Sequence, residues 1–278
     1  FNLAIIFATG FSYGLTPLIG MLQGSGNTQG IGRVFRNALV AHTALALLLT
    51  AIMYVVYCFV DQMGQPVELL PHIRPYFILQ LVSLVFVMLF NSYRQFAEGL
   101  TDTRTPMWIL LGGNALNIVG NYLLIYGSFG LPEWGLFGAG VSTLVSRVVM
   151  LLVFVVIVAG APRYRAYREA IRHSRFNRND FVQLNALGWP IALQMGMETA
   201  AFSLSAIMVG WLGSVPLAAH QIMISVSTLG FMIYYGMGAA LAVRVSHFMG
   251  QRDFPNLQRA VHAGLGIIGV LAVAACLF

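Results

Sequence analysis

Long apolar runs separated by short polar stretches dominate the chain. Eight of these runs reach or approach the roughly 20 residues that an α-helix needs to cross the hydrocarbon core of a bilayer. They cover residues 1–23, 37–60, 75–95, 107–126, 136–160, 184–212, 217–249 and 260–278. The runs are too long and too continuously apolar for the alternating strands, about ten residues each, of an outer-membrane barrel. The pattern therefore predicts an all-α membrane protein, a polytopic bundle of transmembrane helices.

The composition leads to the same class. Of the 278 residues, 58% are hydrophobic and 9% are charged, whereas about 25% of the residues of a soluble domain are charged. So few charges cannot cover a soluble surface, which excludes a soluble enzyme and a DNA-binding domain. The chain contains no lysine, and hence no lysine-bearing phosphate loop, and neither an HExxH nor a GxSxG motif. We therefore expect no enzymatic activity and no cofactor.

The positions of the arginines predict the orientation in the membrane. Twelve of the 15 basic residues lie in one set of alternate loops, whereas the opposite set holds only Arg74. The twelve are Arg33, Arg36, Arg94, Arg104, Arg163, Arg165, Arg168, Arg172, Arg175, Arg178, Arg252 and Arg259. Because arginine-rich loops stay in the cytoplasm, we expect a multi-pass protein of the inner (plasma) membrane. This bias also explains the net positive charge without a nucleic-acid partner.

The longest polar stretch divides the chain into two parts. We expect an N-terminal lobe at 1–160, a cytoplasmic linker at 161–182 and a partial C-terminal lobe at 183–278. Five residues recur at a constant offset of 226 positions: Gly10, Leu15, Gly24, Arg33 and Leu39 match Gly236, Leu241, Gly250, Arg259 and Leu265. Both copies place a cytoplasmic loop between two apolar helices. This predicts a parallel repeat about an axis along the membrane normal, a common plan in transporters.

One acid lies well inside a predicted membrane helix. Glu198 is near the middle of 184–212, with Gln194 four residues before it and Ser205 seven residues after it on the same helix face. An ionisable group at membrane depth is costly and usually functional. It can be discharged by a proton or by a bound cation, which is what a cation-coupled carrier requires. The alternative is a carboxyl group that a buried partner neutralises permanently.

Other polar residues at membrane depth form a second set of candidates. Asn114, Asn117 and Asn121 recur at i, i+3 and i+7, and their amide oxygens suit sodium, although asparagine also holds membrane helices together. His220 and Gln221 follow an external turn, where a histidine either titrates or packs. Arg147 lies deep in its helix and needs a partner that the sequence does not identify. These side chains mark the places where binding and coupling are expected.

Several of these segments together resemble a known family. Pro190-Ile191-Ala192-Leu193-Gln194, followed by Glu198, resembles the seventh helix of the multidrug and toxic compound extrusion (MATE) family, and Ala218-Ala219-His220-Gln221-Ile222 resembles the helix after it. The stretch from Asn114 to Thr143 is similar to the fifth and sixth helices. The resemblance covers essentially the whole chain, as helices two to nine of twelve. We therefore expect a piece of a longer membrane protein.

The resemblance implies a fold and an activity. The fold is two pseudo-symmetric six-helix lobes around a central cleft, and the activity is secondary antiport of cationic or amphipathic drugs and toxic compounds against inward Na⁺ or H⁺. Glu198 matches the cation-coupling acid of the C-terminal lobe. Asn117, Asn121 and Thr143 match polar positions of a cation site in the N-terminal lobe, although Asn121 stands where related members carry an aspartate.

The remaining expectations concern the cleft and the partners. Gln194, Asn114, His220 and Gln221 are candidates for contact with the substrate in the cleft. The expected partners are small-molecule drugs or toxins, a monovalent cation and the lipid bilayer, with the protein acting as a monomer and without a metal cofactor. Two alternatives stay open at this point. One is a lipid-linked saccharide flippase of the same superfamily, and the other is a membrane scaffold that does not transport.

Overall fold

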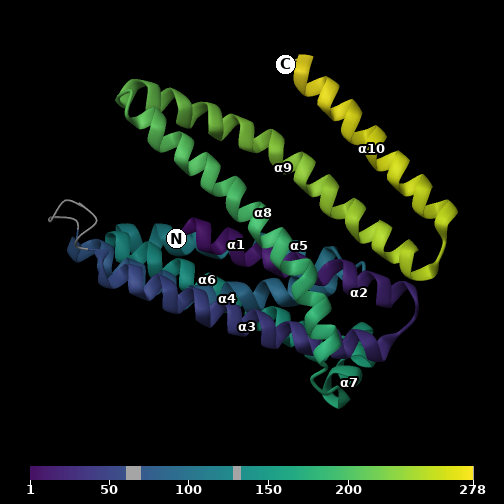
Figure 1. Ribbon diagram of the computed structural model, residues 1–278. Coiled ribbons are helices and arrows are strands. Elements are labelled where there is room, and N and C mark those ends of the chain that lie inside the picture. The colour runs from purple at the N-terminus through teal and green to yellow at the C-terminus, as the bar shows by residue number, and fades with distance from the viewer. Residues whose placement is uncertain (61–69, 128–132, 278) are drawn as a thin grey trace.

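The protein is almost entirely helical. Its structure, a computed structural model, describes residues 1–60, 70–127 and 133–277. Within these ranges the helices are joined by short turns, and Figure 1 shows them arranged in two groups. The helices are α1 (Asn2–Tyr13), α2 (Leu15–Gly24), α3 (Thr28–Cys58), α4 (Leu70–Gly99), α5 (Arg104–Tyr126), α6 (Gly135–Gly160), α7 (Arg165–His173), α8 (Arg178–Gly210), α9 (Ser214–Gln251) and α10 (Phe254–Leu277), with a 3₁₀ turn at Pro162–Tyr164.

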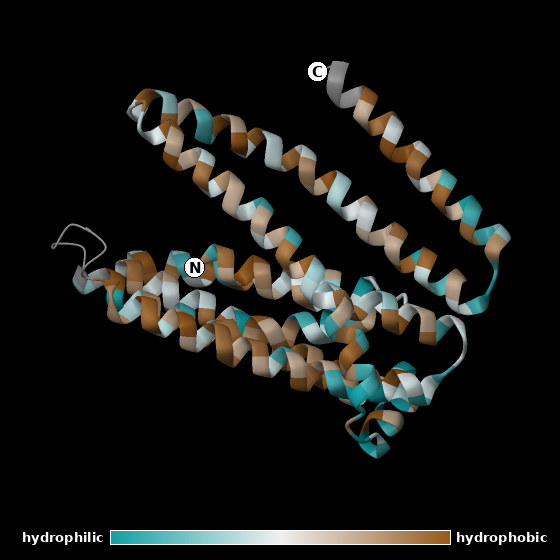
Figure 2. Cartoon of the chain, viewed as in Figure 1, coloured by the Kyte–Doolittle hydropathy of each residue, from teal (hydrophilic) through white to brown (hydrophobic). Residues whose placement is uncertain are grey.

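Eight helical spans of the described residues are long and apolar enough to cross a bilayer. The first is Asn2–Gly24, which comprises α1 and α2, and the others are α3, α4, α5, α6, α8, α9 and α10. Large apolar side chains such as Trp108, Ile118 and Val156 are exposed, as lipid-facing residues are. Hydrophobic residues follow the helices along their length (Figure 2). The prediction of an all-α, multi-pass membrane protein is confirmed.

The first span is bent, which the apolar pattern did not predict. α1 ends at Tyr13 and α2 begins at Leu15, with Gly14 between them. Pro17 explains the break, because proline has no backbone N–H and its ring clashes with the carbonyl group four residues earlier, here that of Tyr13. The bend lets the two halves of one span contact two different helices, since α1 packs on α8 and α2 packs on α9.

The two groups of helices are joined through the α1–α8 and α2–α9 contacts. α1–α6 pack against one another and are called the N-terminal lobe here, and α8–α10 are called the C-terminal lobe. α8 starts beside α3 and α7, crosses α1 and then diverges from the N-terminal lobe towards its turn into α9 (Figure 1). The ends of α8 and α9 that meet at this turn therefore lie away from α1–α6.

The two copies of the sequence repeat meet at the closed end. A Cβ atom on Gly24 would overlap the carbonyl oxygen of His247, and a Cβ atom on Gly250 would overlap that of Met21. The two contacts are equivalent under the 226-residue repeat, since Met21 corresponds to His247 and Gly24 to Gly250. The α2–α9 contact is therefore reciprocal, as expected of two segments related by a pseudo-two-fold axis.

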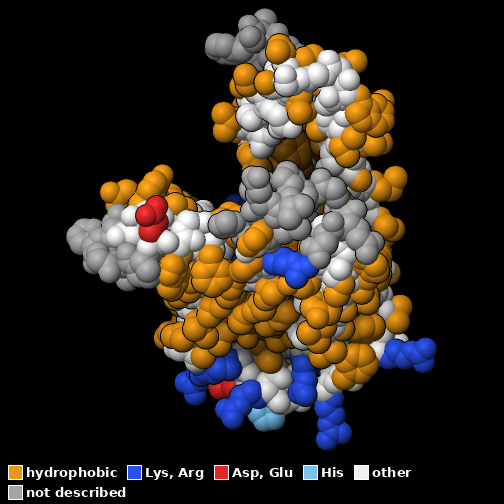
Figure 3. Space-filling model, turned by 90° about the vertical axis from the view of Figure 1, so that its left-hand side faces the viewer, with side chains coloured by type: hydrophobic (Ala, Val, Ile, Leu, Met, Phe, Trp, Pro, Cys, Tyr) orange, Lys and Arg blue, Asp and Glu red, His pale blue; other side chains and the backbone are white. Residues whose placement is uncertain are grey.

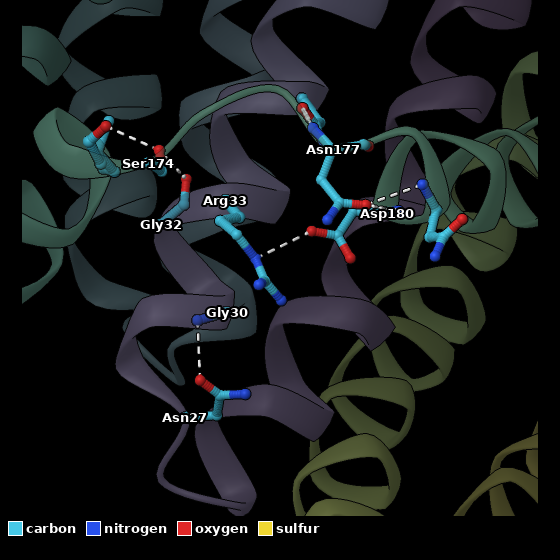
Figure 4. A network of polar contacts seen from close by, with 10 residues as sticks. Asn27, Gly30, Gly32, Arg33, Ser174, Asn177 and Asp180 are labelled. Atoms are coloured by element: carbon cyan, nitrogen blue, oxygen red, sulfur yellow. Dashed lines mark hydrogen bonds and ion pairs between the residues drawn. The ribbon is translucent and has the colours of Figure 1, made fainter.

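The polar linker is docked on the N-terminal lobe. The Asn37 side chain donates to the Asn177 carbonyl (2.8 Å), and Arg33 pairs with Asp180 at 3.3 Å. Figure 4 shows Arg33, Ser174, Asn177 and Asp180 gathered around the first turns of α3. Asn177 also accepts bonds from the backbone N–H groups of Asn179 and Asp180, and this cap starts α8 at Arg178, earlier than the apolar run predicts.

The same end of the molecule carries much of the positive charge. In Figure 3 the arginine side chains gather at the lower end, where α7 lies in Figure 1, below a belt of hydrophobic side chains. This distribution agrees with the arginine count of the loops, from which a cytoplasmic position of that end is predicted. The same prediction places the α2–α9 contact, which lies beside Gly24 and Gly250, on the cytoplasmic side.

Candidate functional site

The structure joins three of the predicted cation-site residues in one network between α5 and α6. The Asn117 side-chain amide donates to Thr143 Oγ1 at 3.3 Å and to Ser142 Oγ at 3.4 Å. The Asn121 amide donates to Asn117 Oδ1 at 3.3 Å. The helices approach closely here because Gly120 faces Ser142, where a Cβ atom would overlap the Ser142 hydroxyl. Ser142 is a member that the sequence analysis missed.

The network leaves one acceptor unused. Asn121 Oδ1 is buried and has no hydrogen-bond partner among the described residues. A buried carbonyl oxygen without a partner carries a desolvation cost of about 1–3 kcal/mol, so it favours any donor or cation that reaches it. The cluster consists of neutral oxygen atoms, and neutral amides bind a cation more weakly than a carboxylate does. These residues fit a weak cation site that needs a negative charge from elsewhere.

Asn114 does not belong to this network. It lies one turn before Asn117 on α5, but its side chain is exposed and makes no hydrogen bond with a described residue. A spacing of i, i+3 and i+7 places three side chains along one stripe, yet only Asn117 bonds to α6, and Asn121 joins the network through Asn117. As a contact for a small molecule in a cleft, Asn114 stays a prediction.

The acidic candidate lies on α8. Glu198 and Gln194 are both exposed, and neither makes a hydrogen bond or ion pair with a described residue. The face of α8 that packs on α1 is marked by the buried residues Gly188, Ala192 and Gly196. Glu198 follows Gly196 by two residues, or about 200° around the helix. Glu198 therefore points away from α1.

The remaining cleft candidates lie at the start of α9. Gln221 is exposed, and His220 is half-buried with its Nε2 atom buried and without a hydrogen-bond partner among the described residues. Both residues follow the α8–α9 turn, which lies at the end of the C-terminal lobe that diverges from α1–α6 in Figure 1. The described residues therefore do not form one site. They form a polar cluster in the N-terminal lobe and separate polar side chains on α8 and α9.

Arg147 has partners that the sequence analysis did not identify. Its Nη1 group donates to Gln80 Oε1 at 3.0 Å and to the hydroxyl of Ser83, both on α4. Among the described residues, no carboxylate pairs with this guanidinium group. Gln80 and Ser83 are three residues apart on a predicted membrane helix, a spacing that could have marked them as a polar pair on one face.

A charged cluster connects the α4–α5 turn to the linker. Asp102 accepts hydrogen bonds from the Tyr164 hydroxyl (2.5 Å) and Thr105 Oγ1 (2.7 Å) and pairs with Arg163 at 3.0 Å. Burial alone would raise the pKa of Asp102, but these hydrogen bonds and the arginine charge outweigh it and lower that pKa. Asp102 is therefore ionised at neutral pH and connects the α4–α5 turn to the linker.

These features define a two-lobed polytopic membrane protein with ionisable groups at membrane depth. The family model described as MatE matches residues 1–123 and 190–278. The Multidrug resistance protein NorM of Photobacterium profundum is 32% identical over 270 residues, which cover 96% of this chain and 59% of that protein. NorM of Vibrio cholerae serotype O1 is 28% identical over 271 residues, with coverages of 98% and 59%. The chain belongs to the MatE family.

Solved structures share the fold. An outward-facing multidrug resistance MATE family transporter of the MOP superfamily matches with a TM-score of 0.78 and 21% identity, over 99% of this chain and 61% of that one. MATE in its bent conformation matches with a TM-score of 0.86 and 21% identity, with the same coverages. The chain thus spans about three fifths of the length of these relatives. The family resemblance drawn from the sequence motifs is confirmed.

Proposed function

We propose that the protein is a secondary active antiporter of the plasma membrane that exports cationic or amphipathic drugs and toxic compounds in exchange for inward Na⁺ or H⁺. The observation that carries the proposal is Glu198, a carboxyl group inside an apolar span with no partner among the described residues. A carboxylate at membrane depth is stabilised by taking up a proton or a cation. That uptake is the event to which substrate release is coupled.

The arrangement of the lobes supports the same proposal. The lobes meet where α1 contacts α8 and where α2 contacts α9, and they separate towards the α8–α9 turn. A protein that opens to the two sides alternately needs such a contact to break and re-form while the site stays in place. Glu198 lies on α8 two residues beyond Gly196, which still packs against Phe7 of α1. The acid is therefore close to the point where the lobes diverge.

The direct test is reconstitution of the full-length protein in liposomes that contain a fluorescent cationic dye. We expect dye movement when a Na⁺ or H⁺ gradient is imposed, and the ion that drives it is the coupling ion. Dye movement that depends on neither the Na⁺ gradient nor the H⁺ gradient would contradict antiport. Translocation of a lipid-linked saccharide without dye transport would favour the flippase alternative. A protein that moves neither compound would fit a membrane scaffold.

The network in the N-terminal lobe gives a further prediction. We expect Asn117→Ala to weaken transport several-fold, because Asn117 connects Asn121 to Thr143 and Ser142. We expect Asn121→Asp to strengthen cation affinity, because it adds a carboxylate beside neutral donors. Both are measured as efflux per correctly folded molecule. Ile118→Ala, which changes an exposed side chain on the same helix outside the network, is the control. If Asn117→Ala and the wild type show equal efflux per folded molecule, the cluster serves helix packing and not transport.

A further inference from the structure

We propose that the first turns of α8 form a binding site for an anionic phospholipid, in which Arg178 holds the phosphate and an apolar groove holds one acyl chain. The site is separate from the candidate transport residues and does not depend on what the protein exports. Three observations carry the proposal. They are a groove along one face of α8, an arginine with unused donors at the end of that face, and an excess of positive charge around the arginine.

The groove runs along α8 where its membrane span begins. Its volume is about 470 Å³, and it is lined by Phe181, Val182, Asn185, Ala186, Trp189 and Pro190. From Arg178 to Pro190 the helix rises about 18 Å, which is close to half of the roughly 30 Å hydrocarbon core of a bilayer. The groove and the arginine together therefore have the length of one phospholipid in one leaflet.

The lining favours a hydrocarbon chain over a polar ligand. Its two polar side chains are bonded within the helix, since the Asn185 amide donates to the Phe181 carbonyl at 2.8 Å and the Trp189 indole N–H donates to Asn185 Oδ1 at 3.1 Å. The Trp189 ring also packs edge-on against Phe7 and Phe11 of α1, with centroids 5.9 and 5.7 Å apart. The surface left for an occupant is mainly apolar, and burial of apolar surface is what an acyl chain offers.

Arg178 lies at the outer end of the same face. It precedes Val182 by four residues and Asn185 by seven, a spacing that aligns side chains along a helix. Its side chain is exposed and makes no hydrogen bond or ion pair with a described residue. The five N–H groups of the guanidinium are therefore available. An arginine binds a phosphate through two parallel hydrogen bonds, so this residue suits the phosphate of a lipid head group.

The residues around this arginine give the site its preference for a negative lipid. Arg172 and Arg175 are also exposed and without a partner among the described residues. The nearest acid in the sequence, Asp180, is paired with Arg33 at 3.3 Å. Clusters of four to eight basic residues beside a membrane span bind anionic lipids, and residues 163–178 include six. A zwitterionic head group would bring its own cation into this field, so the fitting head group carries a net negative charge, as in phosphatidylglycerol.

The test measures contact between lipid chains and the groove in the full-length protein. A small fluorophore is attached to Ala186→Cys in a cysteine-free background, and the protein is placed in phosphatidylcholine nanodiscs. A fraction of the lipid, either phosphatidylglycerol or phosphatidylcholine, carries brominated chains that quench the fluorophore on contact. We expect phosphatidylglycerol to occupy the groove at least about fivefold more strongly than phosphatidylcholine, which is the effect of one basic residue at an anionic surface. Arg178→Gln should remove this preference, and Arg178→Lys should keep part of it, because the charge remains without the fork.

Two controls make the result specific. Arg104→Gln removes an exposed charge at the start of α5 that does not line the groove, and it should leave the preference unchanged. A fluorophore at Leu187→Cys, at nearly the same depth but outside the lining of the groove, should show no head-group preference. Quenching needs no transport, so the lipid site stands or fails independently of antiport.

Three outcomes would overturn the site. The first is equal quenching at Ala186→Cys by both lipids, which would mean ordinary contact with the bilayer. The second is no quenching by either lipid, which would mean that protein covers the groove in the full-length molecule. The third is an unchanged preference in Arg178→Gln, which would mean that the arginine does not hold the head group.

Discussion

Replacing Glu198 by glutamine is expected to abolish cation-driven efflux and to leave membrane insertion unchanged. Glutamine keeps the size and hydrogen-bonding capacity of the side chain but cannot bind a proton or carry a negative charge. Since no described residue pairs with Glu198, the substitution breaks no ion pair within the described residues. We expect the gradient-dependent part of efflux to fall to background, measured in liposomes with an imposed Na⁺ or H⁺ gradient.

A control must show that the loss is specific to this carboxylate. Glu169→Gln makes the same chemical change in α7, on an exposed side chain whose partner is Arg165 one turn away at 3.3 Å. Exposed pairs of this kind contribute little to stability, so efflux should stay normal. Comparable surface expression of both variants excludes a folding defect. Full gradient-driven efflux by Glu198→Gln would contradict the coupling role and, with it, the main support for antiport.

The membrane spans were predictable because one physical requirement dominates them. In the hydrocarbon core of a bilayer the backbone must satisfy its own hydrogen bonds over about 20 residues, which requires a helix. An apolar run of that length therefore predicts a membrane-spanning helix. The bend at Gly14 had a signal as well, since Pro17 removes the N–H group that would reach Tyr13. The early start of α8 could not be predicted from the apolar pattern, because it depends on the Asn177 cap and on the ion pair between Asp180 and Arg33, which are far apart in the sequence.

The candidate site was predictable only in part. The α5–α6 network joins residues in two helices that are consecutive in the sequence, so the motif already brought Asn117, Asn121 and Thr143 together. The partners of Arg147 lie 67 and 64 residues away on α4, and a local pattern cannot pair residues so far apart. The sequence also could not show that Asn114, although part of the asparagine stripe, lies outside the α5–α6 network. A helical period gives the direction of a side chain but not the distance to the neighbouring helix.

The repeat leads to the second large effect, on the α2–α9 contact at the end that is predicted to be cytoplasmic. We expect Gly250→Ala to shift the protein towards conformations in which the cytoplasmic ends of α2 and α9 are apart. The new methyl group would overlap the backbone carbonyl of Met21, which cannot rotate away as a side chain would. Overpacking of this kind costs about 1–3 kcal/mol, and about 1.4 kcal/mol changes a population ratio tenfold. Gly24→Ala should act equally, because the contact is reciprocal.

The shift is measured by double electron–electron resonance spectroscopy. Spin labels are attached to cysteines introduced by Ser25→Cys and Arg252→Cys, in a background without Cys58 and Cys276. A longer distance component should grow several-fold in Gly250→Ala. Gly266→Ala is the matched control: nothing lies within 4 Å of its added methyl, and Val40, its counterpart in the first repeat, is exposed. Alanine also favours the helix over glycine by about 1 kcal/mol, so lower helix stability cannot explain an opening. An unchanged distance distribution in Gly250→Ala and Gly24→Ala would mean that the glycine contact does not control closure.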